Sequence, residues 1–470
     1  MFRTFCLSLV AIFLVAATSQ GAEKPAAEDK ETDPLVLKKL EWFQDQKFGF
    51  FMHWGIYSQW GCIESWPLVE VDKWARTDDL KPWIERRKDF ARFFRDYRVL
   101  NTTFNPQRFD PDKWAAIAKA AGTKYVVFTT KHHDGFCMFD TRQTDYRTTH
   151  ASCPFHTNPK ADAVKAVFDA FRKEGFGIGV YFSKSDWRHP DYWSPDRPHK
   201  DRNVNYDTRR EPEKWRRFVR FTHAQIEELM TNYGPADILW LDGGQVRPPE
   251  QDIDMPRLAA MARRRQPGLI VVDRTVTGRY ENYRTPEQEV PDKTLPYVWE
   301  SCLTMGDQWS HKPDDKYKST HKLVHLLVDI VAKGGNFLLN VGPTADGELP
   351  AEAVQRLQEI GAWLKVNGEA IYGTRAIAPY KEGRTCLTQK SGKVYLIYLA
   401  DKAEEGLPAE IKVKALRRAS AVRMLGTDAR LTWAADPQQG LTIRISDAVR
   451  AALPCRHAWA FEVEGSALGK

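Results

Sequence analysis

The 470-residue chain lacks the sequence motifs of the common cofactor-binding proteins. It contains no Walker A sequence and no G-x-G-x-x-G motif that opens a helix, so neither a P-loop nucleotide site nor a dinucleotide site is predicted. Its seven cysteines are scattered without a C-x-x-C pair, which argues against a structural zinc site. We therefore expect no bound cofactor and no metal, and a core of this size does not depend on disulfides.

Long apolar runs are also missing after the N-terminal segment. Arg3 supplies a positive charge, residues 5–17 are apolar and residues 19–22 are small or polar, so residues 1–22 are predicted to be a secretory signal peptide. No later stretch reaches about 18 uninterrupted apolar residues, so no stable membrane insertion is expected. Residues 23–34 show no periodicity and are predicted to be a flexible leader. The expected localisation is the periplasm or the outside of the cell, and a lysosome is the alternative.

Charge of one sign is not in large excess. The formal net charge of +7 is modest for this length, and both signs are interspersed, as in residues 209–220. This pattern is typical of a solvated surface and does not predict a nucleic-acid partner, although it is compatible with an acidic polysaccharide.

Aromatic residues, in contrast, are abundant, with sixteen tryptophans and sixteen tyrosines. Several tryptophans lie where predicted strands end, among them Trp54, Trp187, Trp240 and Trp299. Core packing accounts for most such rings, but flat apolar rings beside carboxylates and histidines also suit the C–H face of a sugar. We therefore include Trp54 and Trp299 among the candidate sugar contacts.

The middle of the chain alternates short apolar runs with helical patterns. The helical segments are predicted at about 111–122, 161–173 and 213–232, each marked by capping residues or by apolar residues at helical spacing. Strand, helix and strand at this rhythm indicate βαβ units. We predict an α/β fold with a (β/α)8-like (TIM) barrel over residues 35–365, with an open doubly wound sheet as the alternative. The strand signals are residues 48–55, 125–135, 177–183, 237–244, 269–274, 298–300 and 336–342.

The last hundred residues have a different pattern. Residues 351–364 resemble a final helix, and a turn-rich hinge follows. Short alternating runs then predict a C-terminal antiparallel β-sandwich over residues 366–470. These runs are residues 393–399, 410–414, 441–445 and 458–463.

Asp242 is the strongest catalytic candidate. In the segment 237–244 it follows the apolar residues 238–241 and precedes Gly243 and Gly244. A carboxylate at the carboxyl end of a buried parallel strand is a candidate catalyst, whereas a lone Asp-Gly pair more simply begins a turn or caps a helix.

His132 and His133 invite a metal-binding interpretation. Neighbours on a regular strand point to opposite faces, so we expect that the two imidazoles do not chelate one ion. An imidazole offers both a donor and an acceptor, which suits a sugar hydroxyl better.

Taken together, the motifs resemble those of the α-L-fucosidases of glycoside hydrolase family 29. The resemblance spans about residues 35–375 and implies a barrel followed by a β-sandwich. It also implies a retaining exo-glycosidase that removes terminal α-L-fucose from oligosaccharides or glycoconjugates through a covalent fucosyl-enzyme. The matching motifs are Lys47-Phe-Gly-Phe-Phe-Met-His-Trp-Gly55, Lys131-His-His-Asp-Gly135, Tyr181, Leu239-Trp-Leu-Asp-Gly243, Thr285-Pro-Glu287, Trp299-Glu300 and Gly334-Gly-Asn-Phe-Leu-Leu-Asn-Val-Gly-Pro343.

The resemblance implies that Asp242 is the nucleophile. Glu287 is the favoured acid/base, and Glu300 is its rival, with a structural hydrogen-bond acceptor as the other interpretation of Glu300. Many relatives place a glutamate directly before the tryptophan, whereas this chain has Glu64-Ser-Trp66. This departure weakens the substrate-contact role that the resemblance implies for Glu64. The implied substrate contacts are His53, Glu64, Trp66, His132, His133, Tyr181, Trp240 and Arg274.

Other functions stay open at this stage. They are a non-catalytic fucose-binding protein, against which the carboxylate of Asp242 argues, a metal-dependent hydrolase, and a retaining glycosidase for a related sugar such as galactose. The long irregular segment 187–214 is expected to wall the leaving-group side. The sequence carries no signal for the fucosyl linkage, the acceptance of sulfated polymers or the oligomeric state. Candidate contacts to a second sugar in this segment are His189, Tyr192, Trp193, His199 and Tyr206.

Overall fold

The computed structural model describes residues 30–468. The predicted signal peptide and residues 23–29 of the predicted leader lie outside this range. The last leader residues are held in place instead of being free. Glu31 accepts a hydrogen bond from Arg263 over 2.7 Å, and the Asp33 side chain caps helix α1 (Pro34–Gln46). Glu31 and Asp33 of the predicted leader therefore contact the folded part of the chain.

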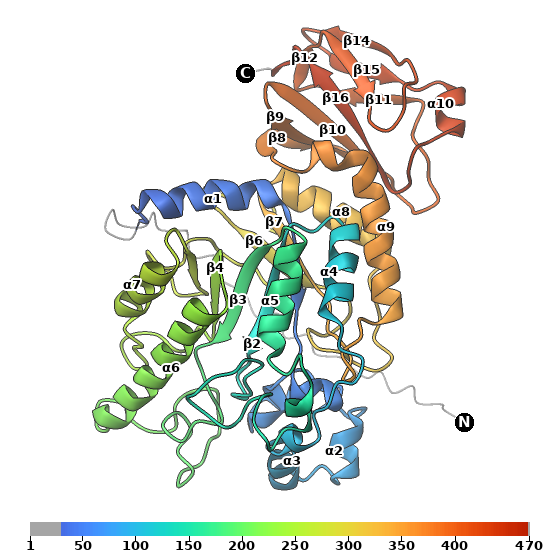
Figure 1. Cartoon of the computed structure of the whole chain (residues 1–470). Coiled ribbons are helices and arrows are strands. Elements are labelled where there is room, and N and C mark those ends of the chain that lie inside the picture. The colour runs from blue at the N-terminus through green and yellow to red at the C-terminus, as the bar shows by residue number, and fades with distance from the viewer. Residues whose placement is uncertain (1–29, 469–470) are drawn as a thin grey trace, which may run out of the picture.

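The catalytic part is built on a curled parallel sheet of seven strands, in the order β5-β4-β3-β2-β1-β7-β6 (Figure 1). Every strand residue is buried except Asp242 at the end of β4, as expected for a parallel sheet covered on both faces. The predicted barrel-like α/β fold is thus confirmed. The strands are β1 (Phe48–Met52), β2 (Tyr125–Lys131), β3 (Gly177–Ser183), β4 (Ile238–Asp242), β5 (Ile270–Asp273), β6 (Glu300–Thr304) and β7 (Asn336–Asn340).

An irregular segment takes the place of an eighth strand. Residues 281–287 run between the two edge strands and form isolated bridges to both, Glu281 with Val272 of β5 and Glu287 with Cys302 of β6. The segment 281–287 therefore bridges both edge strands directly. Because this wall of residues 281–287 is not a regular strand, its side chains need not alternate between core and solvent. It carries Glu287 to the rim of the barrel.

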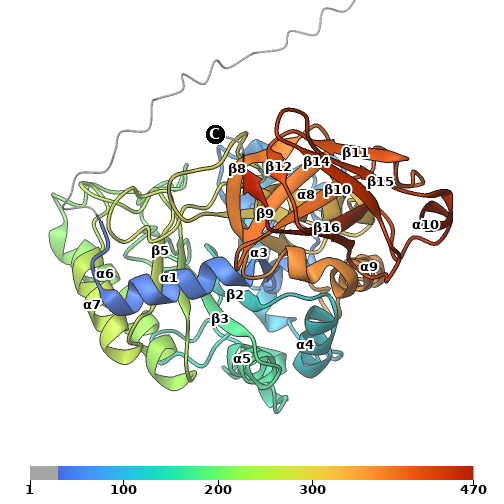
Figure 2. The same ribbon diagram turned by 90° about the horizontal axis from the view of Figure 1, so that it is seen from above.

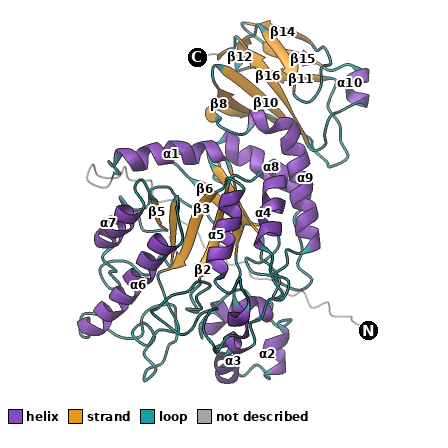
Figure 3. Cartoon of the chain, viewed as in Figure 1, coloured by secondary structure: helices purple, strands orange, loops and turns teal. Residues whose placement is uncertain are grey.

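Helices cover the outer face of the sheet (Figure 3). The predicted start of one helix is confirmed by its cap, since Asp110 accepts from the Lys113 amide. The helix predicted from about residue 161 begins at Ala163, with Asp162 as its cap. The helices are α4 (Pro111–Ala120), α5 (Ala163–Lys173), α6 (Pro212–Asn232), α7 (Met255–Arg265), α8 (Thr320–Ala332) and α9 (Ala351–Asn367). Shorter helices are α2 (Lys81–Glu85), α3 (Phe90–Tyr97), η2 (Ile56–Gln59), η3 (Trp66–Leu68), η4 (Lys73–Ala75), η5 (Leu100–Thr102), η6 (Pro154–Thr157) and η7 (Gly368–Ala370).

The C-terminal part is made of antiparallel sheets, as predicted. Five strands form one sheet in the order β13-β16-β10-β9-β8, three form another in the order β11-β15-β14, and β12 pairs with β17. The elements are β8 (Arg375–Glu382), β9 (Thr385–Lys390), β10 (Lys393–Leu399), β11 (Glu410–Val413), β12 (Leu416–Arg418), β13 (Ala421–Met424), β14 (Thr432–Asp436), β15 (Gly440–Arg444), α10 (Asp447–Ala451), β16 (Ala458–Glu464) and β17 (Ala467–Leu468).

This C-terminal part packs against the amino-terminal end of the barrel strands (Figures 1 and 2). Arg375 pairs with Asp45 just before β1 over 2.6 Å, and Tyr372 donates to the Gly122 carbonyl just before β2 over 2.5 Å. The carboxyl ends of the strands lie at the opposite end of the barrel, where loops follow them.

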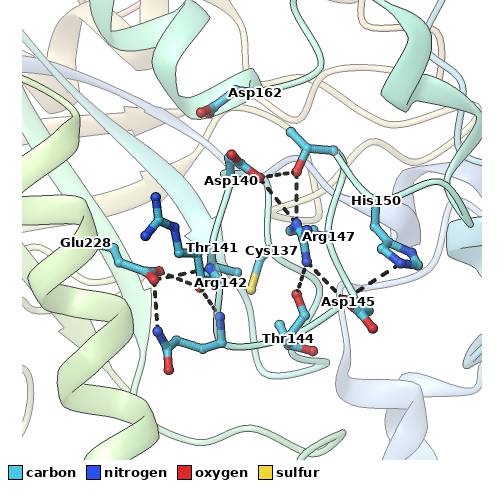
Figure 4. Close-up of polar contacts among 12 residues, drawn as sticks. Cys137, Asp140, Thr141, Arg142, Thr144, Asp145, Arg147, His150, Asp162 and Glu228 are labelled. Atoms are coloured by element: carbon cyan, nitrogen blue, oxygen red, sulfur yellow. Dashed lines mark hydrogen bonds and ion pairs between the residues drawn. The ribbon is translucent and has the colours of Figure 1, made fainter.

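The loop that follows β2 is tied down by a polar network (Figure 4). Arg147 donates to the Thr144 carbonyl over 2.5 Å and pairs with Asp145 over 3.2 Å, and Glu228 of α6 accepts from the Thr141 hydroxyl over 2.5 Å. These contacts fix the chain that continues from the His132-His133 pair.

Within residues 30–468 no helix is long and apolar enough to cross a membrane. The cysteines of this part of the chain are all unpaired, namely Cys62, Cys137, Cys153, Cys302, Cys386 and Cys455.

Candidate active site

A cavity of about 540 Å³ opens at the carboxyl ends of the barrel strands. Its wall includes residues from six of the seven strands or the loops that follow them, which is where a barrel places its chemistry. The cavity brings together most of the residues that the sequence singled out. They are His53, Glu64, Trp66, His132, His133, Trp240, Asp242, Arg274 and Glu287.

Asp242 lies at the floor of this cavity, with 17% of its side chain exposed. Its Oδ2 accepts from the Tyr181 hydroxyl over 2.7 Å, and its Oδ1 accepts from the Gly243 amide over 2.8 Å and from Arg274 over 3.1 Å. Gly243 turns with φ of +88°, a conformation that favours glycine, so the chain can leave the strand directly after the carboxylate.

The charge of Asp242 is stabilised by these neighbours. Burial alone would raise the pKa of Asp242, but the Arg274 guanidinium, His133 and the Tyr181 hydroxyl outweigh burial and hold the pKa below its usual value. Asp242 is therefore an anion throughout the physiological range, as a nucleophilic carboxylate must be.

Arg274 links this carboxylate to a second one. Its Nη1 donates to Asp242 while its Nη2 donates to Glu287 Oε2, and its Nε donates to Thr285 over 3.1 Å. The guanidinium also lies 4.8 Å from the centre of the Trp240 ring. Glu287 keeps 43% of its side chain exposed and faces the cavity, so the cavity offers one buried and one accessible carboxylate.

Three histidines converge beside Asp242. The rings of His132 and His133 lie 4.2 Å apart, and His133 Nε2 lies 3.7 Å from Asp242 Oδ2. Burial lowers the pKa of all three imidazoles, to about 4 for His53 and His133, so they are neutral at physiological pH. We expected the two neighbours to diverge, and this was wrong because β2 ends at Lys131, before the pair.

The hydrogen-bond partners of His53 and His133 determine which nitrogen of each imidazole carries the proton. The Ser183 hydroxyl donates to the Ser185 carbonyl over 2.6 Å, so at 2.6 Å it must accept from His133 Nδ1–H. Asn340 Nδ2 donates to the Trp309 carbonyl over 2.6 Å, so its Oδ1 must accept from His53 Nδ1–H over 2.8 Å. In the neutral rings of His53 and His133, Nε2 is consequently an acceptor that can accept a hydrogen bond from a hydroxyl group.

Glu64 also belongs to the cavity, despite the departure of its motif from the usual pattern. The inserted Ser65 contacts His132 Nδ1 over 2.6 Å, while Glu64 Oε1 accepts from the Ser310 amide over 2.6 Å. Burial, together with the charges of Glu287 and Asp242, raises the pKa of Glu64 to about 8. Its buried Oε2 has no hydrogen-bond partner among the described residues, so a neutral carboxyl group is available there.

Four predicted site residues do not line the cavity, namely Trp54, Trp299, Glu300 and Tyr181, although the Tyr181 hydroxyl reaches Asp242. Trp54 packs in the core against Phe109 and Trp114, and its Nε1 donates to the Thr344 carbonyl over 2.9 Å. Trp299 is 1% exposed and faces Gly335. Both predictions of a sugar contact were wrong, because each ring is buried in the protein core and does not line the cavity.

Glu300 is fully buried behind Trp240. It accepts from Tyr125 over 2.5 Å and from Trp240 and Tyr283 over 3.3 Å each, and burial raises its pKa to about 7. This is the structural hydrogen-bond acceptor that was the alternative interpretation of Glu300.

Some cavity residues carried no sequence signal. Trp74 lies in the short helix η4, and Arg202, Gln245, Arg247 and Trp309 lie in irregular loops, so none of them belongs to a periodic pattern. In the segment 187–214, Tyr192 and Trp193 are instead buried within the loop, at 0% and 3% exposure, and Arg202 is the residue that reaches the cavity.

His132, His133 and Asp242 present donor atoms within 4.8 Å of one another, a spacing that a metal ion could use. However, Asp242 already accepts from Arg274 and Tyr181, and His132 and His133 each use Nδ1 on a serine hydroxyl. The same three groups are arranged to contact a hydroxylated ligand.

A barrel with a buried aspartate anion and an accessible glutamate in a cavity of sugar size, lined by neutral imidazoles and tryptophans, defines the class of glycoside hydrolases. Comparison with known proteins narrows this class. The family model described as Alpha-L-fucosidase matches residues 14–369, and the chain belongs to that family.

Individual relatives agree with this assignment. Human tissue alpha-L-fucosidase is 29% identical over 98% of this chain and 97% of its own length. Alpha-L-fucosidase isoenzyme 1 from Paenibacillus thiaminolyticus is 31% identical, with a TM-score of 0.75 over 93% of this chain and 100% of that structure. A trapped covalent intermediate of an alpha-L-fucosidase from Bacteroides thetaiotaomicron is 25% identical, with a TM-score of 0.71 over 94% of this chain and 99% of that structure.

Proposed function

We propose that this chain is a retaining exo-α-L-fucosidase that hydrolyses terminal α-L-fucose from oligosaccharides or glycoconjugates. The observation that carries the proposal is the ionised Asp242 at the floor of the cavity, bridged through Arg274 to the accessible Glu287. The trapped covalent intermediate of the Bacteroides thetaiotaomicron relative supports a double displacement.

In this mechanism Asp242 attacks the anomeric carbon while Glu287 protonates the departing oxygen. Glu287 then takes a proton from water, which attacks the fucosyl-enzyme and releases fucose with its configuration retained. Glu287 must carry a proton in the first step, so its contact with Arg274 has to loosen when substrate binds. Its partial exposure gives the side chain room to turn.

Glu287 is a better acid/base than Glu300 on geometry. Glu287 lines the cavity, whereas Glu300 is enclosed by three donors behind Trp240 and has no path to a glycosidic oxygen. A general acid must reach the atom that it protonates.

The remaining cavity residues suit fucose in two ways. Nε2 of His53 and of His133 can accept from sugar hydroxyls, and the neutral carboxyl of Glu64 can donate to one. Phe51 lies 5.3 Å from Trp240 and 5.9 Å from Trp309 between ring centres, and all three rings line the cavity. This apolar corner favours the methyl group of a 6-deoxy sugar over the hydroxymethyl group of galactose.

We propose further that the protein is exported to the periplasm or secreted. The N-terminal pattern of one positive charge, an apolar run and small residues supports this localisation.

The test is release of 4-nitrophenol from the α-L-fucoside by wild type and Asp242→Asn, with α- and β-galactosides as controls and a chelator present. Activity on the fucoside that survives chelation and is lost in the variant supports the proposal. Binding of fucose without turnover of any fucoside would indicate a carbohydrate-binding protein. Preference for a galactoside would overturn the proposal in favour of a galactosidase. Loss of activity with chelator would overturn it in favour of a metal-dependent hydrolase.

A further inference from the structure

Trp74 is an unusual residue at the mouth of the cavity. It lines the cavity, yet 51% of it is exposed, whereas the other aromatic side chains of the wall are buried or half-buried. Its neighbour Val71 is similarly exposed but does not line the cavity. An exposed large aromatic surface at the edge of a binding cavity is a frequent mark of ligand contact.

The ring of Trp74 is held in one orientation by a buried carboxylate. Trp74 Nε1 donates to Asp72 Oδ1 over 3.1 Å, and the Asp72 side chain is only 10% exposed. Because the polar edge of the indole is engaged in this way, the surface left open at the mouth is apolar carbon. A ring fixed before the ligand arrives loses little freedom on binding.

The same carboxylate positions a guanidinium beside the ring. Arg202 donates to Asp72 from Nε over 2.9 Å and from Nη2 over 3.1 Å, and it lies 4.3 Å from the centre of the Trp66 ring. These contacts leave Nη1 of Arg202 free for a ligand within the part of the chain that the structure describes. The segment 66–76 and the segment 187–211 thus build one wall, with apolar carbon next to an N–H donor.

This wall leads outward from the nucleophile. His133 lies beside Asp242, the Trp66 ring lies 5.0 Å from the His133 ring, and the Trp74 ring lies 6.0 Å from the Trp66 ring. Trp74 and Arg202 therefore line the same cavity as Asp242, on the side of His133 and Trp66.

We propose that Trp74 and Arg202 form a subsite for the leaving group, and that this leaving group is a pyranose. The C–H face of the ring stacks on Trp74 while one of its hydroxyls accepts from Arg202. This inference rests on the proposed function and adds to it the two residues that contact the leaving group.

The test compares kcat/KM for two kinds of substrate, methyl α-L-fucoside and a panel of fucosyl disaccharides linked α1,2, α1,3, α1,4 and α1,6. For the best disaccharide, Trp74→Ala is expected to lower the ratio of its kcat/KM to that of the methyl fucoside about tenfold, the usual range for a lost apolar contact. Trp74→Phe should restore most of the ratio, because it keeps a flat apolar ring. Val71→Ala, which changes an exposed residue of the same segment outside the cavity, is the matched control and should leave the ratio unchanged.

A ratio that stays the same in Trp74→Ala overturns the subsite, and so does an equal loss on both substrates, since that would place the effect in the fucose pocket or the fold. If wild type cleaves the methyl fucoside but none of the disaccharides, the subsite fails while the proposed function stands. If wild type cleaves neither kind of substrate, the proposed function itself fails.

Discussion

Arg274 donates from Nη1 to Asp242 Oδ1 over 3.1 Å, and both side chains are largely buried at the floor of the cavity. This contact is the strongest of the interactions that hold the pKa of Asp242 below its usual value. Asp242 therefore owes its ionisation in a buried setting chiefly to one guanidinium.

Replacement of Arg274 should raise the pKa of Asp242. In Arg274→Met the acidic limb of the profile of kcat/KM against pH is expected to move to higher pH, because a protonated Asp242 cannot attack. Arg247→Met removes an arginine of the cavity wall that does not contact Asp242, and it should leave the limb in place even if affinity falls. An acidic limb unchanged in Arg274→Met would show that another group maintains the charge of Asp242.

The loss of kcat/KM in Glu287→Ala should depend on the acidity of the leaving group. We expect a fall of about 100-fold or more in kcat/KM on unactivated disaccharides and a smaller fall on the 4-nitrophenyl fucoside, whose departing oxygen needs little protonation. Azide should partly rescue the variant and yield α-L-fucosyl azide, with retained configuration. The measurement is initial rates with product analysis.

Glu300→Gln is the matched variant for this comparison. Since Glu300 accepts from three buried donors, we expect a lower melting temperature but no change in the dependence on the leaving group. Azide rescue of Glu300→Ala together with none in Glu287→Ala would reverse the assignment.

Glu64→Gln should change the dependence of stability on pH. The folded-state pKa of Glu64 is raised from 4.5 to about 8, so between these values the folded state holds a proton that the unfolded state has lost. The free energy of unfolding therefore falls as pH rises through this window. Glutamine removes this dependence. The melting temperature of Glu64→Gln minus that of wild type should therefore be larger at pH 8 than at pH 5.

The exposed Glu85→Gln serves as the control, with no expected change in its difference from wild type between the two pH values. An identical difference for Glu64→Gln at pH 5 and pH 8 would mean that Glu64 is already ionised in the folded state.

Lys184 and Asp273 form a buried ion pair under the turn that follows Asp242. Lys184 also donates to the Val246 carbonyl over 3.0 Å. Burial lowers the pKa of Lys184 and raises that of Asp273, so desolvation exceeds their mutual attraction in both. Asp273→Asn should lower the free energy of unfolding by about 3 kcal/mol, because it leaves a buried charge unpaired.

The double variant Lys184→Met, Asp273→Leu should recover most of this loss in urea denaturation, since an apolar pair of similar volume has no charge to desolvate. A double variant less stable than Asp273→Asn alone would show that the ion pair is itself a net source of stability.

Much of the fold was predictable because its determinants are local. Buried parallel strands are apolar runs, and Asp110 and Asp162 mark helix starts with side-chain caps. The polar residues at the strand ends meet because parallel strands end at one edge, so His53, Asp242 and Arg274 share a cavity as expected. The irregular wall at residues 281–287 had no such signal, since it lacks a regular period.

The errors have physical causes as well. Trp54 was expected to contact sugar, but its ring packs in the core against Phe109 and Trp114, a contact between segments far apart in the sequence. Alternation of side chains along a strand was assumed at His132 and His133. This assumption was wrong, because alternation applies only within a strand and β2 ends one residue earlier. Trp74 and Arg202 come together through Asp72, a contact between segments 130 residues apart that no local pattern encodes.

The most direct test of the account is to trap the fucosyl-enzyme. Wild type is incubated with 2-fluoro-fucosyl fluoride, which slows hydrolysis of the intermediate, and is then digested and analysed by mass spectrometry. The account predicts one added 2-fluorofucosyl group, attached to the peptide that contains Asp242, and no label in Asp242→Asn. A label on any other carboxylate, such as Glu64 or Glu287, would contradict the assignment of Asp242 as the nucleophile.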